Sequence, residues 1–435
     1  MRSGGESTGK YTTAMFRRSR AVRRGVLAVL LAVAAGAPAA PPVHAQAAID
    51  LPVIAVVLAP EHERYRTRIE AAARNAAVSY RQWLGPHRAA IIQLDDRSAG
   101  ASSIDGATRI TLDLPWLSAA PTMEIESRVV FGLARAWWPG WAQQPATRPI
   151  VDGLAWYLQS RVIPEMFDLL YQRPAYNADA AAFFGGVVPW AFPSLTSGRW
   201  TAGLGRAEFL RSGRAPDWPR QVRRLPPDAD PLTPHAALAF GTLERLVGWP
   251  ALEGALAALA PKASAGVMTA TDIERTLSAS VGQPLSWFIA PAWDRDRQFD
   301  YRLGAVSAGP CGRPSCVRTE VTVLNRGDAA FTGTSRSPVG DYGAGDALEL
   351  LVTFADGQQS SVRWDGRAAS KVFTFESTVP PRTVELDPAG ALLLDRSDLD
   401  DAWRAAPNTD VPLAKWIAWW LIWLQDAAIS YGGLI

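Results

Sequence analysis

Few side chains in this sequence could serve as metal ligands, nucleophiles or general bases. Beyond residue 45 the histidines are His62, His87 and His235, and no two of them stand at helical spacing. The two cysteines, Cys311 and Cys316, have no histidine nearby. The sequence contains no G-x-S-x-G, P-loop or G-x-G-x-x-G motif. It therefore predicts neither a serine or cysteine nucleophile nor a phosphate-binding loop.

One stretch has the rhythm of a zinc-binding helix but carries different residues at the ligand positions. Zinc hydrolases use H-E-x-x-H because residues i and i+4 share one helix face, so that two imidazoles reach one metal. The glutamate between them activates the zinc-bound water. The stretch Val129–Trp138, VVFGLARAWW, repeats apolar residues at helical spacing. Its motif positions hold Phe131, Gly132 and Arg135.

Several stretches resemble the membrane alanyl aminopeptidase family of gluzincin peptidases. RVVFGLARAWW (128–138) looks like the family's VVAHELAHQWF helix, and PIVDGLAWYLQ (149–159) looks like its LNEGFATYLE helix, which supplies the third zinc ligand. Residues 237–259 are similar to a later helix pair, and residues 80–96 to a strand entered after an FG-x-y turn. The resemblance runs through residues 50–295 in the family's order, and the large N-terminal β-domain of the family has no counterpart.

The resemblance implies that the zinc site is lost. It places the first histidine at Phe131, the general-base glutamate at Gly132, the second histidine at Arg135 and the third ligand at Asp152. Phe and Gly side chains cannot bind zinc, and a fixed guanidinium repels it. One carboxylate cannot hold a catalytic zinc. The stretch LTPHAALAF, which contains His235, also lacks the family's transition-state tyrosine. We therefore predict no metal and no cofactor.

Two interpretations of the replaced residues remain open from the sequence. In one, Arg135 and Asp152 form an ion pair that joins the two helices without a metal. In the other, Asp152 only complements the N-terminal end of its helix and Arg135 points to solvent.

Aromatic residues around these positions also allow two interpretations. They could line a groove that binds a peptide, or they could belong to the core. The residues of this candidate groove are Trp137, Trp138, Trp141, Trp156 and His235.

The pattern of elements changes near residue 300. Apolar runs predict strands at 54–58, 89–94 and 108–112, and helical spacing predicts helices at 61–83, 121–138, 148–162, 235–260 and 271–288. The helix at 235–260 is expected to break at residues 248–250. In the helix at 61–83, apolar residues occupy one face, and the other carries the charged residues Arg64, Arg68, Glu70 and Arg74. After Tyr301, about seven short alternating runs predict an antiparallel β-sandwich of immunoglobulin-like type. Its first turn, GPCGRPSC, predicts a disulfide between Cys311 and Cys316.

The two ends of the chain predict export and a membrane anchor. Residues 1–45 have a basic region, an apolar run and a small-residue cleavage pattern, as signal peptides do, although an uncleaved anchor is the alternative. The last segment, 413–435, is mostly apolar and long enough to cross a bilayer or lie at its interface, although a buried core helix is the alternative. Its residues Lys415 and Asp426 fall on one narrow stripe, which predicts a partner protein in the membrane. Its four tryptophans point to one side of a helix, and they are Trp416, Trp419, Trp420 and Trp423.

Charge excludes one class of function. Of the 44 basic and 42 acidic residues, seven basic and one acidic residue lie in 1–45, which leaves 37 basic and 41 acidic residues in the rest. A slightly acidic body is not predicted to bind nucleic acid.

The predicted fold is therefore a multidomain α+β chain, with the divisions as follows. A signal peptide (1–45) precedes a degenerate gluzincin-like α/β-plus-helical domain (46–298), a β-sandwich (299–398), a linker (399–412) and a C-terminal membrane helix (413–435). The predicted function is a non-catalytic scaffold or peptide-binding subunit at the periplasmic face of a bacterial inner membrane. The alternatives are a hydrolase with displaced catalytic residues, using Asp152, Glu126 or His235, and a purely structural envelope protein.

Overall fold

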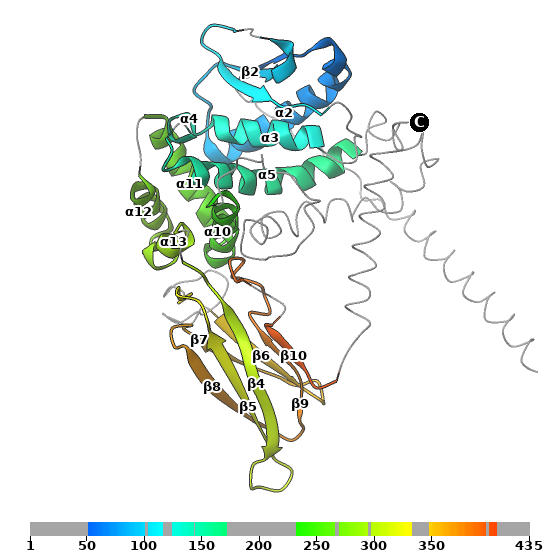
Figure 1. Cartoon of the computed structure of the whole chain (residues 1–435), viewed down its shortest axis with the longest axis vertical. Coiled ribbons are helices and arrows are strands. Elements are labelled where there is room, and N and C mark those ends of the chain that lie inside the picture. The colour runs from blue at the N-terminus through cyan, green and yellow to red at the C-terminus, as the bar shows by residue number, and fades with distance from the viewer. Residues whose placement is uncertain are drawn as a thin grey trace, which may run out of the picture. The chain divides into compact units, whose positions relative to one another are not determined.

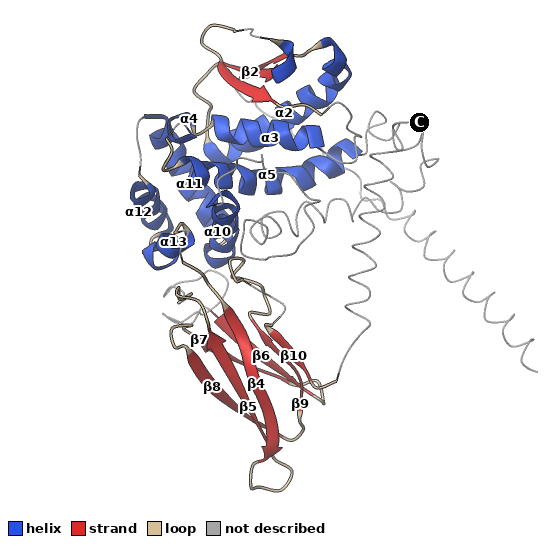
Figure 2. Cartoon of the chain, in the orientation of Figure 1, coloured by secondary structure: helices blue, strands red, loops and turns tan. Residues whose placement is uncertain are grey.

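A computed structural model of the chain shows helices together with parallel and antiparallel sheets (Figure 1, Figure 2). The predicted mixed α+β class is confirmed. The structure describes residues 51–100, 103–115, 124–142, 144–171, 232–265, 269–294, 297–332, 348–396 and 400–406.

The first described elements form a three-stranded parallel sheet in the order β1-β2-β3. Its strands lie close to the predicted ones and are β1 (Val53–Val57), β2 (Ile91–Asp96) and β3 (Thr108–Leu112). The 3-10 helix η1 (Pro60–Tyr65) and helix α2 (Arg66–Leu84) connect β1 to β2. A short 3-10 turn, η2 (Arg97–Ala99), follows β2. The buried face of α2 is rich in alanine, which lets neighbouring elements approach it closely.

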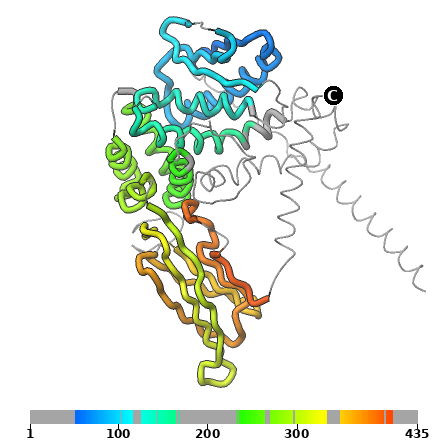
Figure 3. The backbone as a smooth tube through the Cα atoms, viewed as in Figure 1, coloured from blue at the N-terminus to red at the C-terminus, as the bar shows by residue number. Residues whose placement is uncertain are grey.

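A layer of helices packs below this sheet (Figure 1). Helices α3 (Glu124–Ala136) and α5 (Arg148–Tyr171) lie side by side, with the short α4 (Pro139–Ala142) between them in sequence (Figure 3). The later helices are α10 (Leu232–Val247), α11 (Trp249–Ala265), α12 (Ala270–Val281) and α13 (Ser286–Ala292). The predicted break near residues 248–250 separates α10 from α11. Gly248 adopts a φ of 82° there, a backbone conformation that favours glycine.

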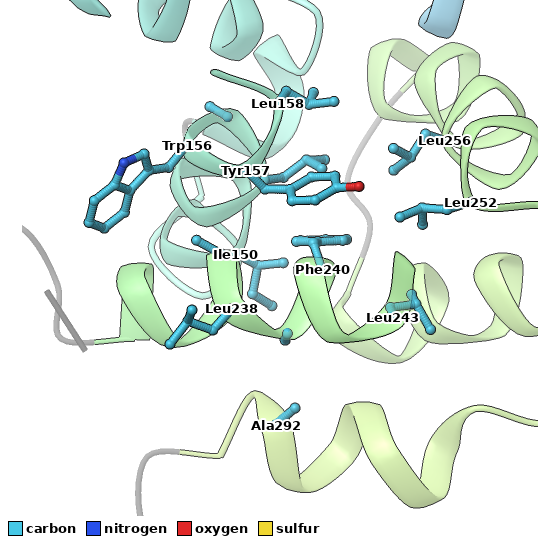
Figure 4. Packing of buried hydrophobic residues seen from close by; sticks show 14 of the residues in the cluster. Ile150, Trp156, Tyr157, Leu158, Leu238, Phe240, Leu243, Leu252, Leu256 and Ala292 are labelled. Carbon is cyan, nitrogen blue, oxygen red and sulfur yellow. The ribbon is translucent and has the colours of Figure 1, made fainter. Parts of the chain in front are cut away.

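Helix α5 is enclosed by the other helices. Tyr157 on α5 stacks against Phe240 on α10 with ring centroids 6.0 Å apart, and Leu252 and Leu256 of α11 lie on the same side (Figure 4). Helix α3 also packs along α5, and between Val151 and Ile163 only Asp152, Ser160 and Arg161 are not buried, which explains why the sequence of α5 shows little amphipathic periodicity.

Two antiparallel sheets make up the region after residue 300. One has the order β4-β5-β8 and the other β10-β9-β6-β7. The strands are β4 (Tyr301–Pro310), β5 (Val317–Asn325), β6 (Leu348–Phe354), β7 (Gln359–Trp364), β8 (Ser370–Ser377), β9 (Pro381–Leu386) and β10 (Ala402–Arg404). Tyr301 of one sheet meets Trp364 of the other edge to face, with ring centroids 5.5 Å apart, so the two sheets bury side chains against each other.

Strand β10 lies inside the segment that the sequence assigned to a linker, 399–412. Ala402, Trp403 and Arg404 pair with β9 in antiparallel register. This strand is not predictable from the sequence, because three residues are too few to show alternation. The β-sheet region therefore extends to at least Arg404.

A loop of the β-sheet region contacts helix α10. The Asp387 carboxylate accepts hydrogen bonds from the backbone N–H groups of Ala391 and Leu392, each at 2.9 Å. These hydrogen bonds shape a loop that brings Leu393 onto α10. There the backbone N–H of Leu393 donates to the Thr242 hydroxyl at 3.0 Å. A Cβ on Gly241 would lie 2.7 Å from Cδ1 of Leu393, so a larger residue at this position would have to displace the end of the Leu393 side chain. The two regions are thus joined by direct packing.

The predicted disulfide is confirmed. Cys311 and Cys316 are bonded, with their Cα atoms 5.4 Å apart, at the turn between β4 and β5. The bond closes the turn of the longest hairpin in the β-sheet region.

The predictions for the two ends of the chain lie outside the described residues. They are the signal peptide, 1–45, and the membrane helix, 413–435, with its stripe and its tryptophans. Within the described ranges, no helix combines the length and the apolar character needed to cross a lipid bilayer.

Candidate functional site: the α3–α5 helix pair

Helix α3 presents only a narrow face that is not buried. The partly exposed side chains follow one another at helical spacing, while the residues between them are buried. We call four of these residues the α3 stripe, namely Arg128, Phe131, Gly132 and Arg135. The three positions that the sequence assigned to the former zinc motif therefore share one face, as the motif requires.

Gly132, at the position of the general-base glutamate, is packed against the sheet. A Cβ built on Gly132 would lie only 2.6 Å from the Cγ2 atom of Ile110 on β3. Glycine thus lets α3 approach β3 closely, and a glutamate at this position would have to displace the Ile110 side chain.

Arg135 and Asp152 form the ion pair that one interpretation of the sequence predicted. The Arg135 Nε atom lies 2.7 Å from Oδ1 of Asp152, and Arg148 Nε lies 3.6 Å from Oδ2. The Arg135 N–H does not point along a hydrogen bond to Oδ1, so the contact is mainly electrostatic. The Arg135 side chain is 33% exposed and that of Asp152 is 17% exposed. The pair joins α3 to α5 at the edge of the solvent.

Next to Asp152, helix α10 rests directly on α5. A Cβ on Gly153 would lie 2.5 Å from the Ala236 Cβ and 2.6 Å from the Thr233 carbonyl oxygen. Because these are largely backbone contacts, they cannot relax as a side chain can. Gly153 thus fixes the N-terminal part of α10 beside the ion pair.

The residues of this helix pair do not fit a zinc ion. Phe131 and Gly132 offer no donor atom, and the Arg135 guanidinium lies on the only carboxylate among the four positions. Across the described ranges, no three His, Cys, Asp or Glu side chains come together in a group that could hold a metal. No catalytic step through zinc can be derived from these residues.

The candidate groove is not open in this structure. Trp137, Trp138, Trp141 and Trp156 are at most 4% exposed, and His235 is 6% exposed. Trp138 and Trp141 stack with ring centroids 5.4 Å apart, and the Trp137 indole N–H donates to the Gly85 carbonyl at 3.2 Å. These residues belong to the core, which was the alternative interpretation. The core interpretation holds because Trp137 packs edge to face on Tyr80 of α2, with ring centroids 5.5 Å apart, and α4, which carries Trp141, packs on both α5 and α11.

Glu126, named for a displaced-site hydrolase, is held in a buried ion pair. Arg68 of α2 donates from Nε to Oε1 at 2.7 Å and from Nη2 to Oε2 at 2.8 Å. The Glu126 side chain is 0% exposed and that of Arg68 is 11% exposed. Arg68 belongs to the charged face of the predicted helix, and its guanidinium turns inward to α3. No spacing rule connects residues this far apart in sequence.

A second buried acid–base contact lies at the end of β2. Asp96 accepts a hydrogen bond from the backbone N–H of Ala59 at 3.0 Å and contacts Nδ1 of His62 at 2.7 Å. Burial alone would raise the pKa of Asp96, but hydrogen bonds from Ser98, His62 and Ala59 outweigh it and lower the pKa. This contact fixes η1 against β2, and no motif or spacing in the sequence indicates it.

Comparison with known proteins gives only a distant similarity. No protein-family model matches this chain, and no curated protein matches it. Among solved structures, Legionella pneumophila aminopeptidase A in complex with aspartic acid is 13% identical with a TM-score of 0.41. The similar region covers 79% of this chain and 36% of that one, so the chain spans about a third of that protein's length. At this level the similarity is no more than a distant likeness of fold.

Proposed function

We propose that this chain is a non-catalytic, peptidase-like protein that acts by binding a partner. The observation that supports this most directly is the Arg135–Asp152 contact of 2.7 Å, which places a guanidinium where a metal would need to sit between the two helices. The packing of Gly132 on Ile110 supports it further, because a glutamate at that position would have to displace the Ile110 side chain. A positive side chain thus replaces a positive ion in holding the helices together.

The finer assignment of the fold belongs to the same proposal. We infer that residues 46–298 form a gluzincin-like domain, from the order of the parallel strands and of helices α3, α5, α10 and α11. We infer an immunoglobulin-like sandwich after it, because two sheets of three and four antiparallel strands divide the chain in the manner of that class.

Location and partners are proposed from the sequence. Export by residues 1–45 and anchoring by residues 413–435 would place the protein at the periplasmic face of the inner membrane, beside an integral-membrane partner. Full-length protein is then expected in the membrane fraction. Recovery of the intact chain from the soluble fraction alone would count against the anchor.

The experiment that tests the lack of catalysis measures metal and activity in one preparation. Full-length protein is purified in mild detergent without chelators, and its zinc is measured by mass spectrometry alongside hydrolysis of fluorogenic aminoacyl substrates. We expect substoichiometric zinc and no hydrolysis above buffer.

A matched pair of variants sharpens this experiment. Asp152→Ala removes the carboxylate of the helix pair, and Asp272→Ala removes an exposed carboxylate on α12. Stoichiometric zinc and hydrolysis that Asp152→Ala abolishes and Asp272→Ala preserves would overturn the proposal in favour of a hydrolase.

A further inference from the structure

The open face of the helix pair differs in charge from the chain as a whole. Beyond residue 45 the sequence has 41 acidic and 37 basic residues. At the helix pair, in contrast, the guanidinium groups of Arg135 and Arg148 share the single carboxylate of Asp152. Two positive charges against one negative charge leave an excess of positive charge at a partly exposed place.

Arg135 retains binding capacity beyond its contact with Asp152. Only its Nε atom approaches that carboxylate, at 2.7 Å. Its two terminal nitrogens make no hydrogen bond within the part of the chain that the structure describes, and the side chain is 33% exposed. A guanidinium presents five donors in a rigid fork, and its terminal edge matches the two oxygens of a carboxylate. Asp152 therefore orients the guanidinium through Nε and leaves its two terminal nitrogens available to a ligand.

The surface beside this edge is apolar. Phe131 is half-buried and lies one turn before Arg135, and the half-buried Ile110 of β3 packs closely on Gly132 beside it. Arg148 is 58% exposed on the other side of Asp152. The stripe thus combines partly exposed apolar side chains with guanidinium groups at its end. A ligand that matches it carries carboxylates next to an apolar side chain.

We propose that the α3 stripe, together with Arg148, binds an acidic peptide segment. A carboxylate of the peptide pairs with the terminal nitrogens of Arg135 and with Arg148, and a neighbouring apolar side chain of the peptide lies on Phe131. This inference rests on the proposed non-catalytic function, because it uses Arg135 as a binding group at a position where zinc chemistry would need a ligand.

The test uses full-length protein in mild detergent and three fluorescein-labelled peptides. Each peptide alternates leucine with one other residue, which is glutamate, glutamine or lysine. We expect the glutamate peptide to bind at least about tenfold more tightly than the glutamine peptide, as measured by fluorescence anisotropy, because charge-assisted pairing is lost. We expect no binding of the lysine peptide, and a weakening of the glutamate peptide's binding by added salt.

Three variants test which arginines bind the glutamate peptide. Arg148→Gln changes an exposed side chain and leaves the Arg135–Asp152 contact in place, and Arg135→Lys keeps the charge beside Asp152 but removes the terminal fork. Each is expected to weaken the glutamate peptide by about tenfold. Arg367→Gln, an exposed arginine in the turn after β7, serves as the control and should have no effect.

The outcomes separate this inference from the proposed function. Equal binding of the glutamate and glutamine peptides, no effect of Arg148→Gln and Arg135→Lys, or no binding up to about 1 mM peptide would overturn the inference. In each case a protein free of zinc would leave the non-catalytic proposal standing. Stoichiometric zinc with hydrolysis would overturn that proposal, whatever the peptides do.

Discussion

Helix α3 contributes to two ion pairs whose surroundings differ. Near its start, Glu126 is 0% exposed and receives two aligned hydrogen bonds from Arg68. Near its end, Arg135 meets Asp152 through one unaligned contact, with both side chains partly exposed. The first pair uses nearly all of its donors and acceptors inside the protein. The second leaves part of a guanidinium facing outward, and that difference separates a structural pair from a candidate binding site.

Breaking the buried pair should have the largest effect. Arg68→Met leaves the Glu126 carboxylate buried without a counter-charge, and we expect a loss of about 3–5 kcal/mol in the free energy of unfolding. The double variant Arg68→Met with Glu126→Leu should recover most of this loss, because both charges are then gone. Denaturant unfolding followed by far-UV circular dichroism measures both. A double variant as unstable as the single one would show that the pair itself, and not the stranded charge, matters.

The partly exposed Arg135–Asp152 pair should contribute much less to the free energy of unfolding. A double-mutant cycle of Arg135→Ala and Asp152→Ala is expected to give a coupling of about 0.5–1 kcal/mol, because water screens both groups and Arg148 remains beside Asp152. The coupling should fall further in high salt. A coupling as large as the effect expected at Arg68 would remove the contrast between the two pairs.

Asp387 is a third carboxylate with a distinct environment. Its contribution to the pH dependence of the free energy of unfolding should be the smallest of the three effects. Burial raises its pKa, while hydrogen bonds from the backbone N–H groups of Leu392 and Ala391 and the nearby Arg245 act in the opposite direction. The folded state therefore binds this proton more tightly than the unfolded state. The stability associated with it is present at pH values below the ordinary aspartate pKa and is lost as the pH rises through the raised pKa.

The measurement compares wild type with Asp387→Asn across that range of pH. Asparagine keeps an acceptor and tolerates the φ of 49° at this position. We expect the stability of the wild type relative to the variant to increase as the pH falls from neutral toward the ordinary aspartate range, since other carboxylates cancel in the difference. A difference that stays constant with pH would contradict the raised pKa.

Local patterns in the sequence predicted most of the elements, because each strand or helix is encoded by neighbouring residues. β3 was predicted at its observed bounds, and the Cys311–Cys316 pair followed from a short turn. Long-range pairing was harder. Nothing in the sequence could show that Arg68 turns inward to Glu126, or that a three-residue strand after residue 400 completes a sheet.

The candidate site was predictable only in part. The resemblance to the peptidase helices singled out Phe131, Gly132, Arg135 and Asp152, and the Arg135–Asp152 ion pair was one of two interpretations that the sequence left open. The burial of the tryptophans could not be decided, because a groove and a core use the same aromatic residues at the same spacing. The close contact of Gly132 with Ile110 depends on how α3 crosses β3, which no local pattern encodes.

The contacts of helix α10 have a mechanical consequence. Near its middle, Gly241 lies against the Leu393 side chain of the β-sheet region, and nearer its start Ala236 lies against Gly153, the neighbour of Asp152. One helix therefore contacts both the β-sheet region and the residue next to the Arg135–Asp152 pair, so a displacement of α10 would alter both contacts.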